Sequence, residues 1–208
     1  MSLTLYCFGE SGHSYKVALQ LALSGLDWEP RFVDFFAGET RGPEFRALNV
    51  MGECPVLIEG GRVTTQSGVI QLDLARRTGL FQGAPEDRDE VLRWILFDNH
   101  KLSAQAGTAR FLSNFVPADK RDPAVIAFVR GRLTAALKVL DAHLATRDWL
   151  AGDGPTIADF ANCSYLYYPE PFGFDRAAYP GIDRWLDRIA ALPGWRHPYD
   201  LMQRAWRG

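Results

Sequence analysis

The segment 49–68 constrains the fold of this chain more than any other stretch. Its apolar run 56–58 is stopped by a Glu-Gly-Gly turn and followed by a second short run at 62–65, a pattern that predicts a tight β-hairpin. Pro55 stands at the start of the first strand. Because proline has no N–H to give to a ladder, it leaves the backbone groups of Cys54 free to pair with something outside the sheet.

The hairpin ends in the pair Gln66-Ser67. Ser67 is predicted to be the N-cap of a helix over 67–78, because a serine hydroxyl accepts a hydrogen bond from the first amides of a helix. A helix N-terminus beside a hydroxyl also attracts a carboxylate. The hairpin therefore suits a small extended peptide that carries a carboxylate.

The first part of the chain predicts a βαβ unit. A short alternating apolar run at 3–7 is typical of a strand, the apolar residues from Ser14 to about Ser24 favour a mostly buried helix, and 31–36 is predicted to be a second strand. A right-handed crossover makes these two strands parallel. Together with the hairpin they predict a four-stranded mixed sheet.

The loop 11–17 between the first strand and helix has three interpretations. Its spacing fits neither pattern of glycine-rich phosphate loop. It also lacks the pair of cysteines of a thiol–disulfide site, with a serine at the helix start instead. The third interpretation is a helix start capped by a hydroxyl group.

The remainder of the chain after the Gly- and Pro-rich stretch 79–88 is predicted to be helical. Apolar residues in 122–147 keep the spacing of one helix face, and 87–115 is a longer helical stretch with a polar middle around Asp98. That polar patch faces solvent, a partner subunit or a cleft. Thr156 and Asp159 predict a capping box at the start of a further helix.

These features, in this order, resemble the glutathione S-transferase superfamily, specifically its bacterial-type members with a serine active site. The resemblance spans the whole chain and implies an α/β plus all-α protein: a thioredoxin-like glutathione-binding domain with a four-stranded mixed sheet at 1–78 and an all-helical C-terminal domain at 86–208. One departure is Asn49-Val50, where the family usually has Asn-Pro.

The same resemblance implies the site residues. Ser11 is the catalytic residue that donates a hydrogen bond to the glutathione sulfur, with Ser14, Tyr6 and Tyr15 as alternatives. The residues implied to bind glutathione are Cys54, Pro55, Gln66, Ser67, Arg41 at the glycine end, and Asp98, which would act across a dimer interface. A solvated loop arginine is the alternative for Arg41.

Composition narrows the range of functions. A net charge of −2 with interspersed signs offers no basic stripe for nucleic acid or a membrane surface. Three separated cysteines indicate neither disulfides nor a metal site, and Cys7 and Cys163 are predicted to be buried as small apolar groups. Without a signal peptide or a run of apolar residues long enough to span a bilayer, the chain is predicted to be cytoplasmic.

The resulting functional prediction is a glutathione transferase that activates the glutathione thiolate for attack on a small hydrophobic electrophile. Glutathione is the co-substrate, no cofactor or metal is predicted, and the resemblance implies a homodimer. The alternatives are a non-catalytic binding or regulatory protein, a glutathione-dependent isomerase and a disulfide reductase. The electrophile site is predicted to be lined by helical residues such as Trp94, Phe97 and Phe111. Cys54 is predicted to contribute its backbone alone.

Overall fold

Four strands form one mixed sheet in the computed structural model, which describes residues 3–207. They are β1 (Leu3–Cys7), β2 (Trp28–Phe32), β3 (Val56–Glu59) and β4 (Arg62–Thr65). The order across the sheet is β2-β1-β3-β4, with β1 and β2 parallel and the other two pairs antiparallel. This confirms the predicted thioredoxin-like domain with its terminal hairpin.

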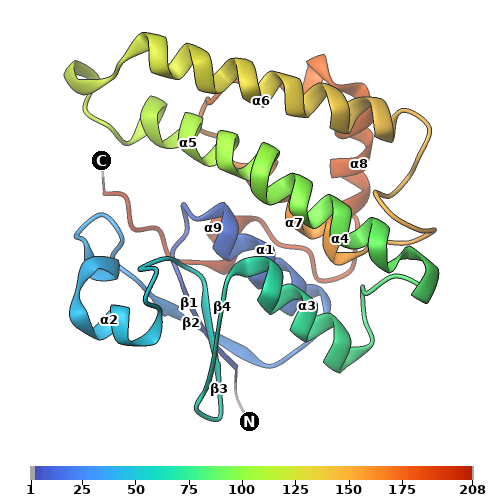
Figure 1. The fold of residues 1–208 in the computed structure, drawn as a ribbon, viewed down its shortest axis with the longest axis horizontal. Helices are drawn as coiled ribbons and strands as arrows, with labels where there is room; N and C mark the ends of the chain where they lie inside the picture. The colour runs from blue at the N-terminus through green and yellow to red at the C-terminus, as the bar shows by residue number, and fades with distance from the viewer. Residues whose placement is uncertain (1–2, 208) are drawn as a thin grey trace. The chain divides into compact units, whose positions relative to one another are not determined.

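Helices cover both faces of this sheet. They are α1 (Gly12–Leu23), η1 (Glu39–Arg41), α2 (Pro43–Leu48), α3 (Ser67–Thr78) and α9 (Pro198–Leu201). Figure 1 shows α1 and α3 lying side by side on one face, where alternate β1 side chains are buried. Beneath α2 on the other face is a cluster of Val33, Phe45 and Val56.

The structure corrects three predicted boundaries in this part of the chain. Strand β2 begins and ends earlier than the predicted 31–36; it includes Pro30, which an edge strand tolerates because one side of its backbone has no partner strand. Helix α1 begins at Gly12 rather than Ser14, with Ser11 as its N-cap. Ser67 is the first residue of α3, and Gln66 occupies the cap position without a side-chain cap bond.

The all-helical part confirms the predicted fold class. Its elements are η2 (Pro85–Asp87), α4 (Arg88–Phe97), η3 (Asp98–Leu102), α5 (Ser103–Asn114), η4 (Ala118–Lys120), α6 (Pro123–Leu144), α7 (Ile157–Cys163), η5 (Ser164–Tyr167), η6 (Arg176–Ala178) and α8 (Pro180–Ala190). Helices α5 and α6 pack against each other and run side by side (Figure 1). None of the helices among residues 3–207 is long and apolar enough to cross a membrane.

The predicted helix over 87–115 contains a π-helical turn, η3, that the sequence pattern did not indicate. A π turn inserts one extra residue, so the side-chain positions shift relative to an ideal helix. Asp98 begins this turn and is buried, and its carboxylate accepts a hydrogen bond from the Ser103 hydroxyl at 2.6 Å. The neighbouring positions 99–101 are exposed.

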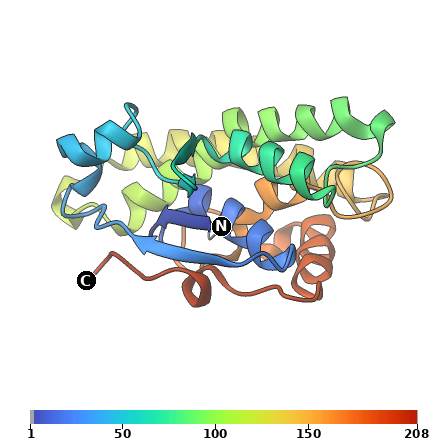
Figure 2. The same ribbon diagram turned by 90° about the horizontal axis from the view of Figure 1, so that it is seen from below.

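Two compact units divide the chain: Met1–Leu80 together with Leu192–Gly208, and Phe81–Ala191. The helical domain predicted from the sequence extended to 208, whereas the segment after Ala191 groups with the sheet. Tyr15 on α1 donates from its hydroxyl to the carbonyl of Arg196 at 2.9 Å. Figure 2 shows this dark red segment running along the unit that contains β1 and β2.

Candidate functional site

Ser11 caps the N-terminus of α1 and uses only its oxygen to do so. Its Oγ accepts hydrogen bonds from the Ser14 amide at 3.1 Å and from the Ser14 hydroxyl at 3.0 Å. A hydroxyl group has one proton in addition to its two acceptor positions. No acceptor for that proton is found among residues 3–207, so Ser11 retains a donor at the end of β1.

His13 and Lys16 follow Ser11 on the first turns of α1. The Lys16 ammonium lies 3.2 Å from Nδ1 of His13, and the Lys16 side chain is buried. Burial, with a smaller contribution from the Lys16 charge, lowers the pKa of His13 well below its ordinary value. The imidazole is therefore neutral at physiological pH, and with Nδ1 accepting from Lys16 its Nε2 carries the proton.

Pro55 follows Cys54 in a cis peptide bond at the start of β3. No backbone hydrogen bond joins Cys54 to another described residue, which agrees with the predicted open backbone edge. The Cys54 side chain packs against the cluster of Val33, Phe45 and Val56. Its backbone and its sulfur therefore have separate surroundings.

The chemistry of the Cys54 thiol follows from that packing. Burial raises its pKa above the ordinary value, and the nearby Cys7 and Glu39 add to the shift because negative charges disfavour a thiolate. Cys7, which is buried as predicted, has its pKa raised by burial to about 12. Cys163 is also buried as predicted. Neither Cys7 nor Cys54 is poised as a nucleophile.

Gln66 and Ser67 lie at the junction of β4 and α3. Gln66 has φ 67°, a left-handed conformation that a residue with a side chain adopts at a cost and that often marks a functional site. Its side-chain nitrogen Nε2 lies 2.9 Å from Sδ of Met51 and 3.2 Å from a carboxylate oxygen of Glu53. The first backbone bond of α3 is from Ile70 to the Gln66 carbonyl. The amides that precede Ile70 are therefore available to a carboxylate.

The strand register brings these three segments to one end of the sheet. Tyr6 pairs with Val56, and Val56 pairs with Thr65. Three segments therefore lie side by side at one end of the sheet: the loop after β1, the Cys54-Pro55 step before β3 and the Gln66-Ser67 pair after β4. Two helix N-termini, those of α1 and α3, begin there, and both favour negative charge.

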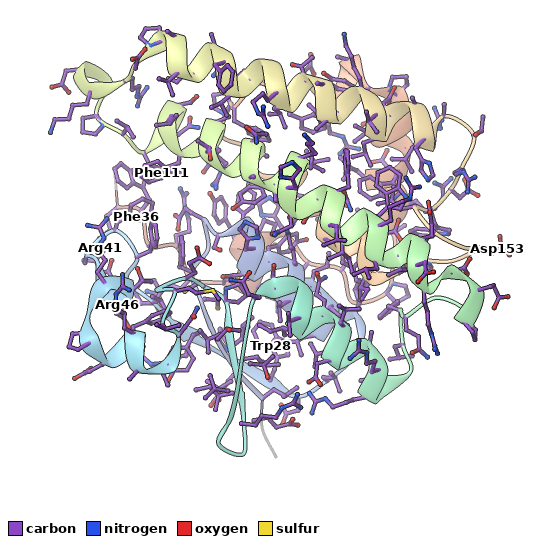
Figure 3. All side chains as sticks on the ribbon, in the orientation of Figure 1. Trp28, Phe36, Arg41, Arg46, Phe111 and Asp153 are labelled. Carbon is purple, nitrogen blue, oxygen red and sulfur yellow. The ribbon has the colours of Figure 1, made fainter. Side chains whose placement is uncertain are left out.

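The other two predicted binding residues belong to different elements. Arg41 is the last residue of η1, on the segment that leaves β2 at the same end of the sheet; it is exposed and forms no ion pair with another described residue (Figure 3). Asp98 belongs to the other compact unit, where its carboxylate is buried beside Ser103 rather than on an exposed polar face.

A residue that the sequence pattern did not single out is Glu10, immediately before Ser11. Its side chain is buried and accepts hydrogen bonds from the backbone amides of Ala205 at 2.8 Å and Trp206 at 3.2 Å. The partners are almost two hundred positions away, so no local spacing indicates them. Among the described residues no group of three His, Cys, Asp or Glu side chains is arranged to hold a metal ion.

Comparison with known proteins gives matches along the whole chain. Residues 1–76 match the glutathione S-transferase N-terminal domain and residues 106–193 the glutathione S-transferase C-terminal domain. Glutathione S-transferase 3 of Zea mays is 31% identical, over 93% of this chain and 91% of its own. Maleylacetoacetate isomerase of Pseudomonas aeruginosa is 31% identical, over 97% of both chains. A crystal structure of a possible glutathione S-transferase from Rhodopseudomonas palustris is 34% identical with a TM-score of 0.88, and the match covers 94% of this chain and 89% of that one.

Proposed function

The chain belongs to the glutathione S-transferase family, and from that premise we propose that it activates the thiol of glutathione for attack on a small hydrophobic electrophile, with Ser11 as the donor to the sulfur. The observation that carries the proposal is the hydrogen-bonding state of Ser11: its oxygen is engaged by Ser14 while its proton has no acceptor among the described residues. The two hydrogen bonds that the Ser14 amide and hydroxyl donate to the Ser11 oxygen also polarise the Ser11 O–H group, which makes it a stronger donor.

Activation works by stabilising the charged form of the thiol. A free cysteine thiol has a pKa of about 8.5, so only a few per cent is thiolate at neutral pH. A hydrogen bond to the thiolate, at an edge of the sheet where two helices begin, lowers that pKa. The thiol proton passes to solvent, and the sulfur then uses an electron pair to form a bond to the electrophilic carbon. A leaving group departs from that carbon with its bonding pair or, in an addition, the π electrons of an activated double bond move away from it and take up a proton from solvent.

Binding of the tripeptide uses the other two segments of the row. The free backbone groups of Cys54 pair with the extended backbone of glutathione, as an added strand pairs with a sheet edge. The amides at the start of α3, with the Ser67 hydroxyl and the Gln66 side chain, hold the carboxylate of the γ-glutamyl end. Arg41 is exposed and without an ion-pair partner among the described residues, so it suits the carboxylate of the glycine end.

Disulfide exchange and isomerisation are two other reactions open to a bound thiol. Disulfide exchange through Cys54 is disfavoured for two reasons. Burial raises the pKa of that thiol, and its side chain packs against the cluster of Val33, Phe45 and Val56. Isomerisation requires the same activated thiolate as conjugation, since the sulfur adds to the substrate and later leaves. An assay panel should therefore pair conjugation substrates with an isomerisation substrate.

The test is Ser11→Ala. We expect turnover to fall by about one to two orders of magnitude, the effect of removing one donor to a developing anion, with glutathione binding nearly unchanged. The matched control is Ser14→Ala, which removes one donor to the Ser11 oxygen and keeps the Ser11 proton, so its effect should be smaller. Loss of turnover in Ser14→Ala alone would transfer the role to Ser14. A wild type that is not retained on immobilised glutathione would reject the proposal in favour of a protein that kept the fold alone.

A further inference from the structure

The last residues of the chain form a strap across the loop that precedes Ser11. We define the C-terminal strap as residues 202–207. The Gly9 amide donates to the carbonyl of Gln203 at 2.7 Å, and the Glu10 carboxylate accepts from the amides of Ala205 and Trp206. In Figure 2 the strap is the dark red segment that leads to the C label. It is therefore bonded to the two residues directly before the proposed catalytic serine.

The contact between loop and strap leaves no space for a larger side chain. A Cβ added at Gly9 would lie 3.1 Å from both the Arg204 Cα and the Met202 carbonyl oxygen, which are backbone atoms. Glu10 is 4% exposed, and it also pairs with the Arg204 guanidinium at 3.2 Å. A buried carboxylate is stable only when donors surround it, and here the strap supplies them.

The strap also reaches the segment after β2. Trp206 packs edge-on against Phe36 with ring centroids 4.8 Å apart, and Arg207 pairs with Asp34 at 3.3 Å. Phe36, labelled in Figure 3, in turn meets Phe8 of the loop after β1, with centroids 6.4 Å apart. The loop before Ser11, the strap and the segment after β2 thus make one connected structure.

We propose that Glu10 is a positioning residue: by binding the strap it fixes the backbone that carries Ser11, and so aims the Ser11 hydroxyl at the thiol. The inference rests on the proposed role of Ser11. A displacement of about 1 Å in a catalytic group can reduce a rate by about 10²-fold. Holding the adjacent Glu10 in place can therefore have a large effect on turnover. In the proposed function glutathione binds through the segments after β4 and before β3, whereas the strap holds Gly9 and Glu10.

The experiment compares Glu10→Gln with wild type in the full-length protein. A glutamine at position 10 keeps one acceptor oxygen in place of two and carries no charge, so it can accept from only one of the two strap amides in the same geometry and loses the ion pair with Arg204. Deuterium exchange of the C-terminal peptide should therefore become at least about fivefold faster. The kcat should fall by about tenfold or more while KM for glutathione changes by less than about threefold. The pKa of the bound thiol, followed by thiolate absorbance, should rise. Glu29→Gln, which alters an exposed carboxylate that accepts from Thr4 in the same unit, is the control and should change none of these.

Each of the other outcomes contradicts either the positioning role of Glu10 or the proposed function of Ser11. Faster exchange of the strap with an unchanged kcat would show that the strap is structural only, and unchanged exchange would show that Glu10 does not hold it. If Glu10→Gln unfolds, Glu10→Asp, which keeps the charge but is one methylene shorter, is measured instead and must show the same split between kcat and KM. If Ser11→Ala retains full turnover, the proposed function fails whatever Glu10 does; if Ser11→Ala is impaired and Glu10→Gln is not, only the positioning role fails.

Discussion

The Asp159 carboxylate is buried in the helical unit and accepts four hydrogen bonds, and its removal allows a quantitative prediction. Its two oxygens accept from the Leu150 amide at 3.0 Å, the Trp185 indole at 2.9 Å, and both the amide and the hydroxyl of Thr156 at 2.8 and 3.1 Å. The bond from the Thr156 amide is one half of the capping box of α7 (Ile157–Cys163), whose other half is accepted by the Thr156 side chain from the Asp159 amide, and this box confirms the sequence prediction. The Thr156 hydroxyl bond adds to it. The other two tie α7 to α8 and to the segment after α6.

The expected cost of Asp159→Ala combines two opposing effects. Three buried N–H donors lose their acceptor, at about 1–3 kcal/mol each, or roughly 6 kcal/mol in total. Against this, burial raises the pKa of Asp159 from 3.8 to about 6, so keeping the group ionised at pH 7 costs about 3 kcal/mol. The variant should therefore be less stable than wild type by roughly 3 kcal/mol at pH 7 and by roughly 6 kcal/mol at pH 4.

The pH dependence has a definite sign. Between the ordinary pKa and about 6 the folded state holds the proton that the unfolded state has released, so the contribution of Asp159 to stability falls as pH rises through this window. Urea unfolding at pH 4, 5, 6 and 7 gives the difference between variant and wild type at each pH. Asp122→Ala, which removes an exposed cap of α6, is the control and should cost only about 1 kcal/mol. A cost of Asp159→Ala that grows as pH rises would refute the assigned direction of the pKa shift, and a cost near 1 kcal/mol would refute the counting of lost donors.

Three further predictions concern the proposed site and assembly. Ser67→Ala should raise KM for glutathione with kcat nearly unchanged, because the interaction is present in ground and transition states alike; steady-state kinetics would reject this by an unaltered KM. Cys54→Val should keep conjugating activity within about threefold, or ~0.7 kcal/mol in the barrier, and oxidised glutathione should add little mass at Cys54. Abolished activity or stoichiometric glutathionylation there would instead point to disulfide exchange. The protein should be a homodimer at micromolar concentration by light scattering, and a monomer would contradict this.

The features that the sequence predicted well are those encoded by local chemistry. The hairpin, the helix over 67–78 and the Thr156 capping box each depend on residues within a few positions of one another, and each is present in the structure.

The features that the sequence did not predict depend on distant partners. The Glu10 carboxylate is buried only because residues 205 and 206 return to it, and Leu192–Gly208 groups with the sheet although it follows a helical region. The sequence pattern predicts a later β2 than the observed Trp28–Phe32, because the aromatic pair Phe35-Phe36 is typical of a strand. Those rings instead pack in the turn, where Phe35 stacks on Phe8 at 4.8 Å. The π turn at Asp98 likewise has no periodic signal.

The two interpretations of Ser11, a helix cap and a catalytic donor, are compatible because they use different atoms. The cap needs the oxygen to accept from Ser14, and activation needs the proton to be donated. Ser11→Ala therefore removes both, and loss of the cap should cost about 1 kcal/mol of stability. The free energy of unfolding of a folded domain is about 5–15 kcal/mol, so a loss of this size leaves nearly all of the protein folded. A fall in turnover of one to two orders of magnitude corresponds to about 1.4–2.7 kcal/mol in the activation barrier, and it cannot arise from that small unfolded fraction. Measuring the stability of Ser11→Ala beside its kinetics thus separates the two roles of one hydroxyl group.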